Sequence, residues 1–478
     1  MAELAMSIAL RTDFGLLIDG KLEPSDEQLD VINPALGEVF ARCPAATRAH
    51  LERAVTAARA AFPAWRDKSF SERAALIKKM SQKLRENQQE LAELLTREQG
   101  KPLAQSIAEI DRGAAQSDGM VGIEIPVEVL ADDKDKHIEL RYRPLGVVGI
   151  ITPWNAPVSL ALGPLVSALY TGNTVILKPS PYTPLSTLKL GELLREIFPA
   201  GVVNVLAGGD ALGVWITEHP KVDKISFTGS VATGKKVLAS AAATLKRVTL
   251  ELGGNDPAIV MDDVDPKAVA KKIFFASFVN SGQVCMAIKR IYAHEKIYAA
   301  LCDALVAEAK KAKVGNGLDP ATELGPIQNK MQYDKVVGII EDTKKRGAKF
   351  LTGGDIPKGP GYFLPPTLVT DVPEDSRLVQ EEQFGPIVPI MKFSSLDDAL
   401  ERANDTRYGL SGSVWTSDVT RGAEIAAKLE VGTAWVNQHR ATSAFVPFGG
   451  AKESGLGRQY SALGLKSYME PEVVSVAK

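Results

Sequence analysis

The pattern of apolar and polar residues changes character near residue 145. Before that point, apolar side chains recur three to four positions apart, as on one face of a helix, at Leu51, Val55, Ala58 and Phe62 and again at Leu76, Met80 and Leu84. Thr47 can cap the first of these helices, and Gly100 with Pro102 stops the second run. The first hundred residues are therefore predicted to be helical.

From Val147 onward, short apolar segments alternate with helical or glycine-rich stretches. The predicted strands are 147–151, 174–177, 202–206, 224–227 and 248–252, and a second set begins with 258–261. Asp265 followed by Pro266 is typical of a helix start. This alternation predicts an α/β protein with parallel sheets flanked by helices.

One uncharged stretch, residues 144–177, is long enough to span a bilayer. Its prolines, Pro153, Pro157 and Pro164, would interrupt a membrane helix. A buried strand, helix and strand are therefore favoured, and no membrane association is expected. Further on, residues 137–142 alternate apolar with polar positions, as a half-exposed strand does, and Val473 to Val476 offer a second such strand.

Bulk properties exclude several classes of protein. With 478 residues, two or three domains are expected. The 56 basic and 58 acidic residues leave a net charge of -2, so no general attraction to nucleic acid or to anionic membranes is predicted. Three scattered cysteines, Cys43, Cys285 and Cys302, favour a reducing compartment, with the cytoplasm as the expectation. Residues 1–10 include Glu3 and lack a basic start, which is untypical of a secretory signal.

Two short segments carry the chemistry. Residues 251–254 (Glu-Leu-Gly-Gly) offer a carboxylate, and residues 280–285 (Asn-Ser-Gly-Gln-Val-Cys) offer a thiol, each among small neighbours. A thiolate is a strong nucleophile, and a nearby carboxylate could deprotonate the water that cleaves the adduct. Alone, each also fits a structural role, as a buried small hydrophobe or a strand-end ion pair. No histidine spacing suggests a Cys-His pair, so activation is expected from backbone donors, a cofactor's positive charge or Glu251.

Five further short segments, together with these two, make the chain resemble the aldehyde dehydrogenase superfamily over nearly its whole length. They are residues 153–155 (Pro-Trp-Asn), 178–180 (Lys-Pro-Ser), 227–230 (Phe-Thr-Gly-Ser), 382–386 (Glu-Gln-Phe-Gly-Pro) and 447–450 (Pro-Phe-Gly-Gly). The resemblance implies that Cys285 is the nucleophile, that Asn155 holds the oxyanion and that Glu251 activates water against a thioester. Because coenzyme-A-acylating relatives typically lack this glutamate, hydrolysis to the free acid is favoured.

The resemblance also implies a nicotinamide dinucleotide site formed by Ile151, Trp154, Lys178, Ser180, Gly229, Ser230, Leu252, Glu382 and Phe384. Lys178 would bind the adenosine ribose and Glu382 the nicotinamide ribose. Residues 229–234 are a weak motif alone, because they depart from the usual G-x-G-x-x-G. Pro181 stands where many NAD-preferring relatives have a glutamate. NADP is therefore possible, but NAD is expected because no second basic residue stands beside Lys178.

A substrate tunnel is implied at Leu160, Gly163, Val279, Met286, Thr442 and Phe448. These mostly apolar or small residues suit a medium-chain aliphatic or an aromatic aldehyde, whereas Arg440 near the mouth leaves an anionic aldehyde possible. Gly163 stands where relatives often have a bulky aromatic, which predicts a roomy tunnel. No clustered histidines or cysteines suggest a metal site.

The domains implied by the resemblance are a Rossmann-type cofactor domain (1–121 with 144–253), an α/β catalytic domain (254–455) and a ribbon with a tail (122–143 with 456–478). The β-ribbon is expected to join subunits of a homodimer or homotetramer, although a surface hairpin within one chain stays an alternative. Two other functions also stay open, a coenzyme-A-acylating enzyme and a catalytically silent structural or binding protein.

Overall fold

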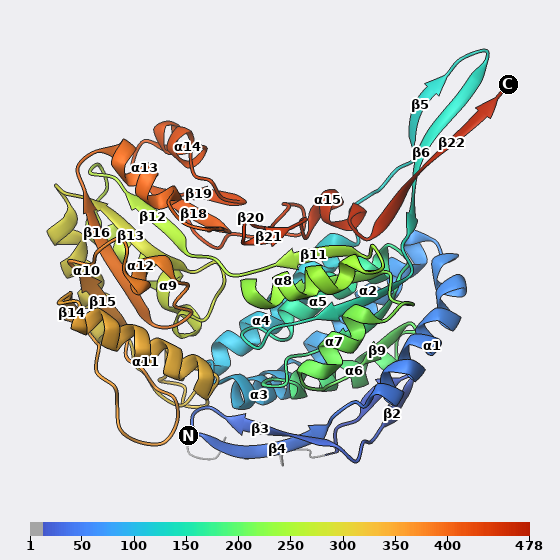
Figure 1. Ribbon diagram of the computed structural model, residues 1–478, viewed down its shortest axis with the longest axis horizontal. Helices are drawn as coiled ribbons and strands as arrows, with labels where there is room; N and C mark the ends of the chain where they lie inside the picture. The colour runs from blue at the N-terminus through green and yellow to red at the C-terminus, as the bar shows by residue number, and fades with distance from the viewer. Residues whose placement is uncertain (1–12) are drawn as a thin grey trace.

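The computed structural model describes residues 13–478, which form two sheets lying side by side and a ribbon that projects from one end (Figure 1). Residues 1–10, where no secretory signal is expected, lie outside the described part of the chain. No helix within residues 13–478 is long and apolar enough to cross a membrane. The uncharged stretch 144–177 instead folds into a strand, a helix and a second strand.

The first sheet has eight strands. Their order is β2 (Lys21–Glu23), β1 (Leu16–Ile18), β9 (Val203–Val205), β8 (Thr174–Lys178), β7 (Val147–Ile151), β10 (Lys224–Thr228), β11 (Arg247–Glu251) and β21 (Gly455–Leu456). The five strands from β9 to β11 are parallel, whereas β1 and β21 pair antiparallel at the two sides. The predicted strands between residues 147 and 252 are therefore confirmed.

Helices cover both faces of this sheet. One face carries α1 (Arg48–Arg66), α7 (Asp210–Glu218) and α8 (Val231–Ala242), and the other carries α5 (Ser159–Tyr170) and α6 (Leu185–Arg195) beneath α2 (Phe70–Glu86), α3 (Gln88–Gln99) and α4 (Leu103–Met120). Thr47 caps α1 as predicted, and its hydroxyl accepts a hydrogen bond from the His50 backbone N–H. Gly100, at φ 94°, ends α3, but α4 begins three residues later.

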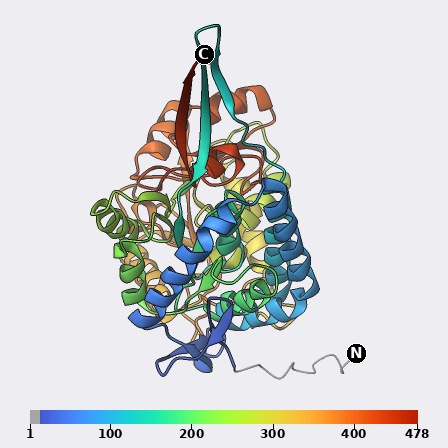
Figure 2. The ribbon, with the colours of Figure 1, turned by 90° about the vertical axis from the view of Figure 1, so that its right-hand side faces the viewer.

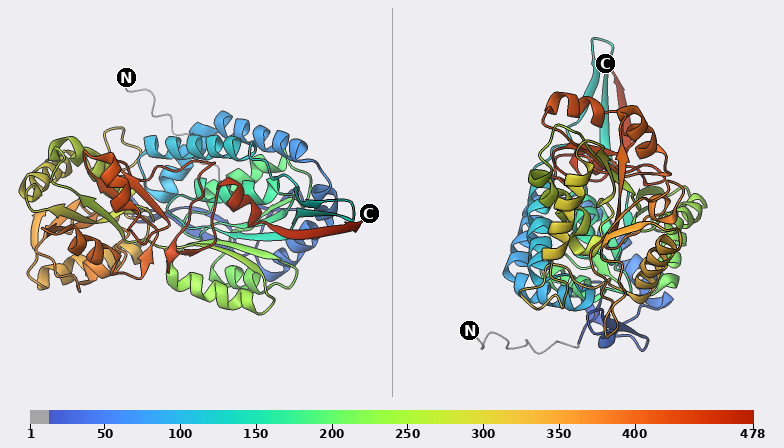
Figure 3. Two further views of the ribbon diagram at one scale, coloured as in Figure 1. Left: turned by 90° about the horizontal axis from the view of Figure 1, so that it is seen from above. Right: turned by 90° about the vertical axis from the view of Figure 1, so that its left-hand side faces the viewer.

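The second sheet has seven strands and its own helices (Figure 3). The strand order is β14 (Lys349–Thr352), β15 (Thr367–Thr370), β16 (Ile387–Phe393), β13 (Ile288–His294), β12 (Asp256–Val260), β18 (Ser411–Trp415) and β19 (Thr433–Val436). Its helices are α9 (Pro266–Phe278), α10 (Tyr298–Lys311), α11 (Lys330–Lys345), α12 (Arg377–Gln380), α13 (Leu396–Asn404) and α14 (Val419–Ala426). Asp265 caps α9 and Pro266 opens it, as predicted.

The projecting ribbon consists of β5 (Glu128–Asp132), β6 (Lys136–Pro144) and β22 (Met469–Ala477), and Figure 2 shows it standing clear of the rest of the chain. β22 follows the short helix α15 (Ser461–Lys466) and pairs antiparallel with β6 over its whole length, from Met469 opposite Pro144 to Ala477 opposite Lys136. The two predicted strands are confirmed, and within one chain they pair with each other.

The prediction of helices throughout the first hundred residues is wrong for residues 16–44. This segment forms β1 and β2 and the hairpin of β3 (Gln28–Asn33) and β4 (Glu38–Pro44). β1 is held by pairing with β9, where Leu17 lies opposite Val205. A local hydrophobic period cannot reveal a pairing that spans so much of the chain. Two further short strands, β17 (Tyr408–Gly409) and β20 (Ala451–Lys452), pair with each other.

Gly149 in β7 tests how tightly the first sheet packs. A Cβ atom at this position would lie 2.6 Å from Ile216 Cγ2 and 3.1 Å from Ile225 Cδ1. We expect Gly149→Ala to lower the free energy of unfolding by about 1–3 kcal/mol because the core is overpacked. The measurement is urea denaturation followed by circular dichroism.

The matched control is Gly338→Ala within α11, where the nearest side-chain atom would lie 3.9 Å from the new Cβ. An alanine in the interior of a helix should raise stability by about 0.5–1 kcal/mol. If both variants shifted stability in the same direction, the steric explanation for Gly149 would be wrong.

Candidate active site

The residues predicted to bind the cofactor gather at one edge of the first sheet. The chain runs from β7 through β8 to β9 on one side, and β10 and β11 lie on the other, so the strand order reverses between β7 and β10. In open parallel sheets, ligands bind at the carboxyl ends of the strands at such a reversal. Ile151, Lys178 and Glu251 each end a strand here, and Gly229 follows a fourth.

Helix α8 begins at this edge. Ser230 is its N-cap, and its hydroxyl accepts a hydrogen bond of 3.2 Å from the Thr233 backbone N–H. The Gly229 N–H donates to the Glu251 carbonyl at 3.0 Å, which ties the turn to β11. A Cβ on Gly234 would lie 2.6 Å from Leu252 Cδ2, so the glycine lets Leu252 pack under the helix. The free amides of the first turn are suited to a phosphate group.

Lys178 is buried, and its ammonium donates to the Pro179 carbonyl at 3.2 Å. Burial lowers the pKa of Lys178 to about 8, an effect that the nearby Asp210 carboxylate opposes. Asp210 opens α7, and the sequence analysis did not identify it. The available signal was a Gly208-Gly209 turn directly after a predicted strand. Ser180 is also buried beside this lysine, and its hydroxyl accepts a hydrogen bond of 3.3 Å from the Tyr182 N–H.

The loop that carries Cys285 has a strained backbone that its surroundings hold in place. Asn280, Ser281 and Gly282 have φ values of 53°, 54° and 74°. The Ser281 hydroxyl donates to the Gly325 carbonyl at 2.6 Å, and the Gln283 side chain donates to the Asn280 carbonyl at 2.9 Å. A Cβ on Gly282 would overlap the Gly385 carbonyl oxygen. Such strain persists only where packing fixes the conformation, and it is common at functional sites.

Asn155 docks directly on this loop. Its side-chain amide donates to the Gln283 carbonyl at 2.9 Å, and its own carbonyl accepts from the Asn280 side chain at 3.0 Å and from Lys101 Nζ at 2.8 Å. Lys101 forms a buried ion pair with Glu109. The other Glu109 oxygen accepts the N–H groups of residues 158 and 159 at the start of α5. Sequence analysis missed this ion pair, because no local pattern links the two charges to Asn155.

Cys285 is partly exposed and lies beside the segment that follows β11, since a Cβ on Gly254 would lie 2.8 Å from the Cys285 carbonyl oxygen. Burial raises the pKa of the Cys285 thiol to about 12. Lys289 opposes this shift, whereas the carboxylates of Glu382, Asp256 and Glu251 add to it. The thiol is therefore protonated at neutral pH in the protein alone.

Lys289 was also missed by the sequence analysis. It is buried, donates to the Val284 carbonyl at 3.0 Å and to the Cys285 carbonyl, and lies 3.5 Å from Glu382 Oε1. The sequence signal that could have identified it is a lysine next to Arg290 at the start of an apolar strand, because a charge there needs buried partners.

Glu251 is buried, and neither of its carboxyl oxygens has a hydrogen-bond partner among residues 13–478. Burial raises the pKa of Glu251 well above its usual value, and Arg458 opposes that shift. The carboxyl group lies beside Gly449, where an added Cβ would come within 2.8 Å of Oε1. An unpaired buried carboxyl group with a raised pKa near a thiol is typical of a functional site.

Glu382 and Phe384 approach the same place from the second sheet. Glu382 Oε1 accepts the Gly254 N–H at 3.0 Å, and a Cβ on Gly253 would overlap Oε2 of that carboxylate. Phe384, at φ 51°, packs edge to face on Trp154 with ring centroids 5.3 Å apart. Trp154 and Phe384, both named as cofactor residues from distant segments of the sequence, thus lie in contact.

On the proposed substrate side, Val279 and Phe448 are buried, whereas Leu160, Met286 and Thr442 are partly exposed. The roomy tunnel predicted from Gly163 is not found at that residue. A Cβ there would lie 3.2 Å from Tyr460 Oη and 3.3 Å from its ring, so the tyrosine fills the space that the glycine leaves. The smaller residue on α5 is compensated by a ring from the C-terminal segment.

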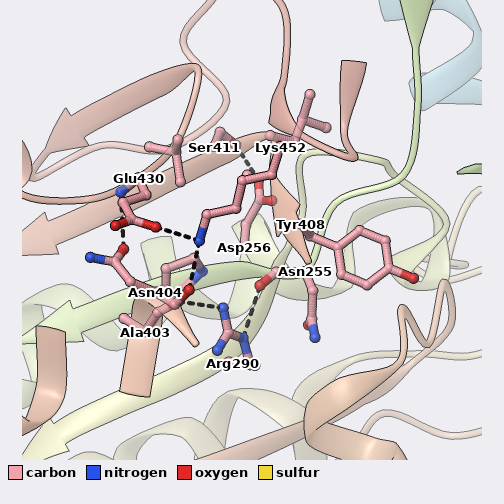
Figure 4. A pocket seen from close by; sticks show the side chains of 13 residues that line it. Asn255, Asp256, Arg290, Ala403, Asn404, Tyr408, Ser411, Glu430 and Lys452 are labelled. Carbon is pink, nitrogen blue, oxygen red and sulfur yellow. Dashed lines mark hydrogen bonds and ion pairs between the residues drawn. The ribbon is translucent and has the colours of Figure 1, made fainter. Parts of the chain in front are cut away.

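A polar cluster behind the nucleophile loop, drawn in Figure 4, is structural. Arg290 is fully buried and donates to the carbonyls of Asn255 and Ala403, each at 2.9 Å. Lys452 donates to the Asn404 carbonyl at 2.6 Å. These side chains close the recess themselves. Within the described residues, no three His, Cys, Asp or Glu side chains are grouped so that they could hold a metal ion.

Comparisons with known proteins agree with this arrangement. The sequence model of the aldehyde dehydrogenase family matches residues 22–474. A putative aldehyde dehydrogenase of Gibberella fujikuroi is 41% identical over 95% of this chain and 96% of its own length. The NAD+ complex of an aldehyde dehydrogenase from Bacillus cereus is 37% identical with a TM-score of 0.95, covering 97% of this chain and 96% of that one. The chain thus belongs to the aldehyde dehydrogenase family.

Proposed function

We propose that this protein oxidises an aldehyde to the carboxylic acid with NAD+ as the electron acceptor and Cys285 as the nucleophile. The observation that carries the proposal is the meeting of three groups from distant segments. The Asn155 amide bonds to the loop of Cys285, and the Glu251 carboxyl group is close enough to affect the pKa of the Cys285 thiol. All three adjoin the strand ends where a dinucleotide binds in such sheets.

The residues at this edge fit NAD+. The first turn of α8, with Gly229 and Ser230, would hold the pyrophosphate, Lys178 the adenosine ribose and Glu382 the nicotinamide ribose. Gly253 supports this assignment, because a side chain there would displace the Glu382 carboxylate. Asp210, close to Lys178, supports NAD over NADP, since its charge would repel a ribose phosphate. When bound, NAD+ accepts the hydride that leaves the substrate carbon.

Cys285 would attack the aldehyde carbonyl as a thiolate to give a thiohemiacetal. One proton of the Asn155 amide is used on the Gln283 carbonyl, so the second is free to donate to the oxyanion together with the Cys285 backbone N–H. Each such donor contributes on the order of 3 kcal/mol. The strained loop and the Lys101–Glu109 ion pair keep both donors in place before substrate arrives.

Glu251 would complete the cycle by deprotonating the water that hydrolyses the thioester. Its raised pKa makes it a stronger base than an exposed glutamate, because the proton-bound form is the one that burial favours. The net change is that aldehyde, NAD+ and water become carboxylate, NADH and two protons. The apolar walls formed by Val279, Met286 and Phe448 favour an aliphatic or aromatic aldehyde of medium length.

The predicted domain boundaries, the subunit contact and the compartment are part of this proposal. The division at residues 253 and 254 is supported by the two sheets on either side of it. A homodimer or homotetramer joined through the ribbon is supported by the exposed Val473 and Val476 on β22. The three free cysteines suit a cytoplasmic location.

The direct test is aldehyde-dependent NADH formation by the purified protein. We expect Cys285→Ala to lower turnover by about 10³-fold or more, because the covalent route is lost. Product analysis should give the free acid, with no requirement for coenzyme A. An alanine variant as fast as the parent protein would refute the proposal, and acyl-coenzyme A as the product would indicate an acylating enzyme.

Glu251→Gln separates the two halves of the reaction. The substitution keeps the side chain's shape, so the first NADH burst should persist while steady turnover falls by about 10²–10⁴-fold. Because Glu251 must be ionised to act, turnover limited by hydrolysis should fall as the pH drops through its raised pKa. Stopped-flow absorbance measures both phases. If the burst were lost while thioester hydrolysis was unchanged, Glu251 would act in the first half of the reaction, and the role proposed for it would be wrong.

The pH dependence of thiol alkylation tests the environment of Cys285. With a pKa near 12, the reactive thiolate fraction should rise about tenfold per pH unit between pH 7 and 10 in the ligand-free protein. Iodoacetamide labelling followed by peptide mass spectrometry measures the rate at Cys285. A rate already at its plateau at pH 7 would show that the thiol is activated without the cofactor.

A further inference from the structure

Two arginines, the half-buried Arg440 beside the nucleophile and the exposed Arg112 near it on α4, have no acidic partner among the described residues. Arg440 comes directly after His439, whose Nε2 donates to the carbonyl of Met286 at 3.0 Å, and Met286 follows Cys285. Arg112 lies on α4, and its charge acts on both Arg440 and Tyr460. Within residues 13–478, neither arginine forms an ion pair or a side-chain hydrogen bond.

The Arg440 guanidinium lies in a partly enclosed position. Its carbon is 5.7 Å from the centre of the Phe275 ring, and its Nε is buried without a hydrogen-bond partner. Burial and the charge of Arg112 lower the pKa of Arg440 to about 10, whereas the Cys285 thiolate opposes that shift. A buried guanidinium N–H without a partner is costly, and a ligand acceptor would relieve this cost.

The acids on α4 make their contacts with residues other than Arg112. Glu109 pairs with Lys101, Asp118 with Arg85, and Asp111 accepts a hydrogen bond from Gln88. Glu251 carries a carboxyl group whose charge acts on Tyr460. It lies beside Gly449, and the positive charge of Arg458 acts against the rise in its pKa. Within residues 13–478, no carboxylate forms an ion pair with either arginine, and the charge of Arg112 acts on Arg440.

Both arginines belong to the proposed substrate side. α4 presents Arg112, Gln116 and Gly119 at helical spacing. The Gln116 side chain lies close enough to the Tyr460 hydroxyl to lower its pKa, and a Cβ on Gly119 would lie 2.8 Å from Ala444 Cβ in the segment after Arg440. The carboxylates near the thiol on the cofactor side, Glu382 and Asp256, are instead held by Lys289 or by Ser411.

We propose that Arg112 and Arg440 bind an anionic group at the far end of the substrate, so that the aldehyde carries a carboxylate separated from its carbonyl by an apolar body. This inference rests on the proposed function and names its substrate class. The apolar walls of the tunnel contact the body, and the guanidinium N–H groups donate to the carboxylate in the paired geometry that arginine favours. An aldehyde bearing a trimethylammonium group would be repelled.

The test compares aldehydes that differ only in charge. Para-formylbenzoate and glutaric semialdehyde are each paired with their methyl esters, and kcat/KM is measured for each from NADH formation. We expect the acids to be preferred over the esters and the preference to weaken with added salt. Arg440→Gln and Arg112→Gln should each reduce the ratio of acid to ester by about 10- to 100-fold.

Arg440→Lys keeps the charge and should retain part of the preference, and Arg421→Gln, on the exposed side of α14, should leave the ratio unchanged. A ratio near one in the parent protein, or a ratio that survives loss of either arginine, would overturn the inference while the ester turnover still supports the proposed reaction.

A second readout needs no aldehyde oxidation. Iodoacetate and iodoacetamide both alkylate Cys285 with loss of iodide, but only the first is an anion. The ratio of their rates should fall by about 3- to 10-fold in Arg440→Gln because the local positive potential is reduced. Thus a protein that turned over no aldehyde would refute the proposed function, and an unchanged alkylation ratio would separately refute the anion site.

Discussion

The structure of the site depends on the contact between the Asn155 turn and the strained loop that ends at Cys285. Two hydrogen bonds fix these segments to each other. The Asn155 side-chain amide donates to the Gln283 carbonyl in the loop, and the Asn155 carbonyl accepts a hydrogen bond from the Asn280 side chain. The Lys101–Glu109 ion pair adds a third support from α4. Buried charges of this kind are costly unless every lone pair is used, and here the same network fixes the start of α5.

The electrostatic layout around the thiol is uneven. On the cofactor side, the carboxyl groups of Glu382, Asp256 and Glu251 act against the buried ammonium of Lys289, and together with burial they raise the pKa of the Cys285 thiol. On the opposite side, Arg440 and Arg112 form no ion pair with any residue of the described part of the chain. Binding of a cationic ring on one side and an anion on the other would balance both excesses. Each proposed ligand would therefore neutralise charge that the protein itself leaves unpaired on its side of the thiol.

Sequence patterns predicted the parts of this molecule that are fixed locally. Strands β7 and β8 are buried on both faces, so each appears in the sequence as a mainly apolar run. Thr47 and Asp265 mark helix starts because capping uses neighbouring backbone groups. The strands at residues 16–44 were missed because their stability comes from pairing with β9 and with each other.

For the site, motif resemblance named residues from distant segments, but Lys101, Lys289 and Asp210 act through tertiary neighbours that no local spacing reveals. The space left by Gly163 likewise depends on Tyr460, which arrives from nearly three hundred residues further along the chain.

The pairing of β22 with β6 has a consequence for the order in which the ribbon is completed. β6 leaves the ribosome before any strand of the second sheet, yet its second neighbour, β22, is made only after that whole sheet. During translation β6 therefore has only β5 beside it, and two strands without a supporting layer are marginal in water. The nascent chain must therefore keep one edge of β6 open until β22 has been made and can cover it.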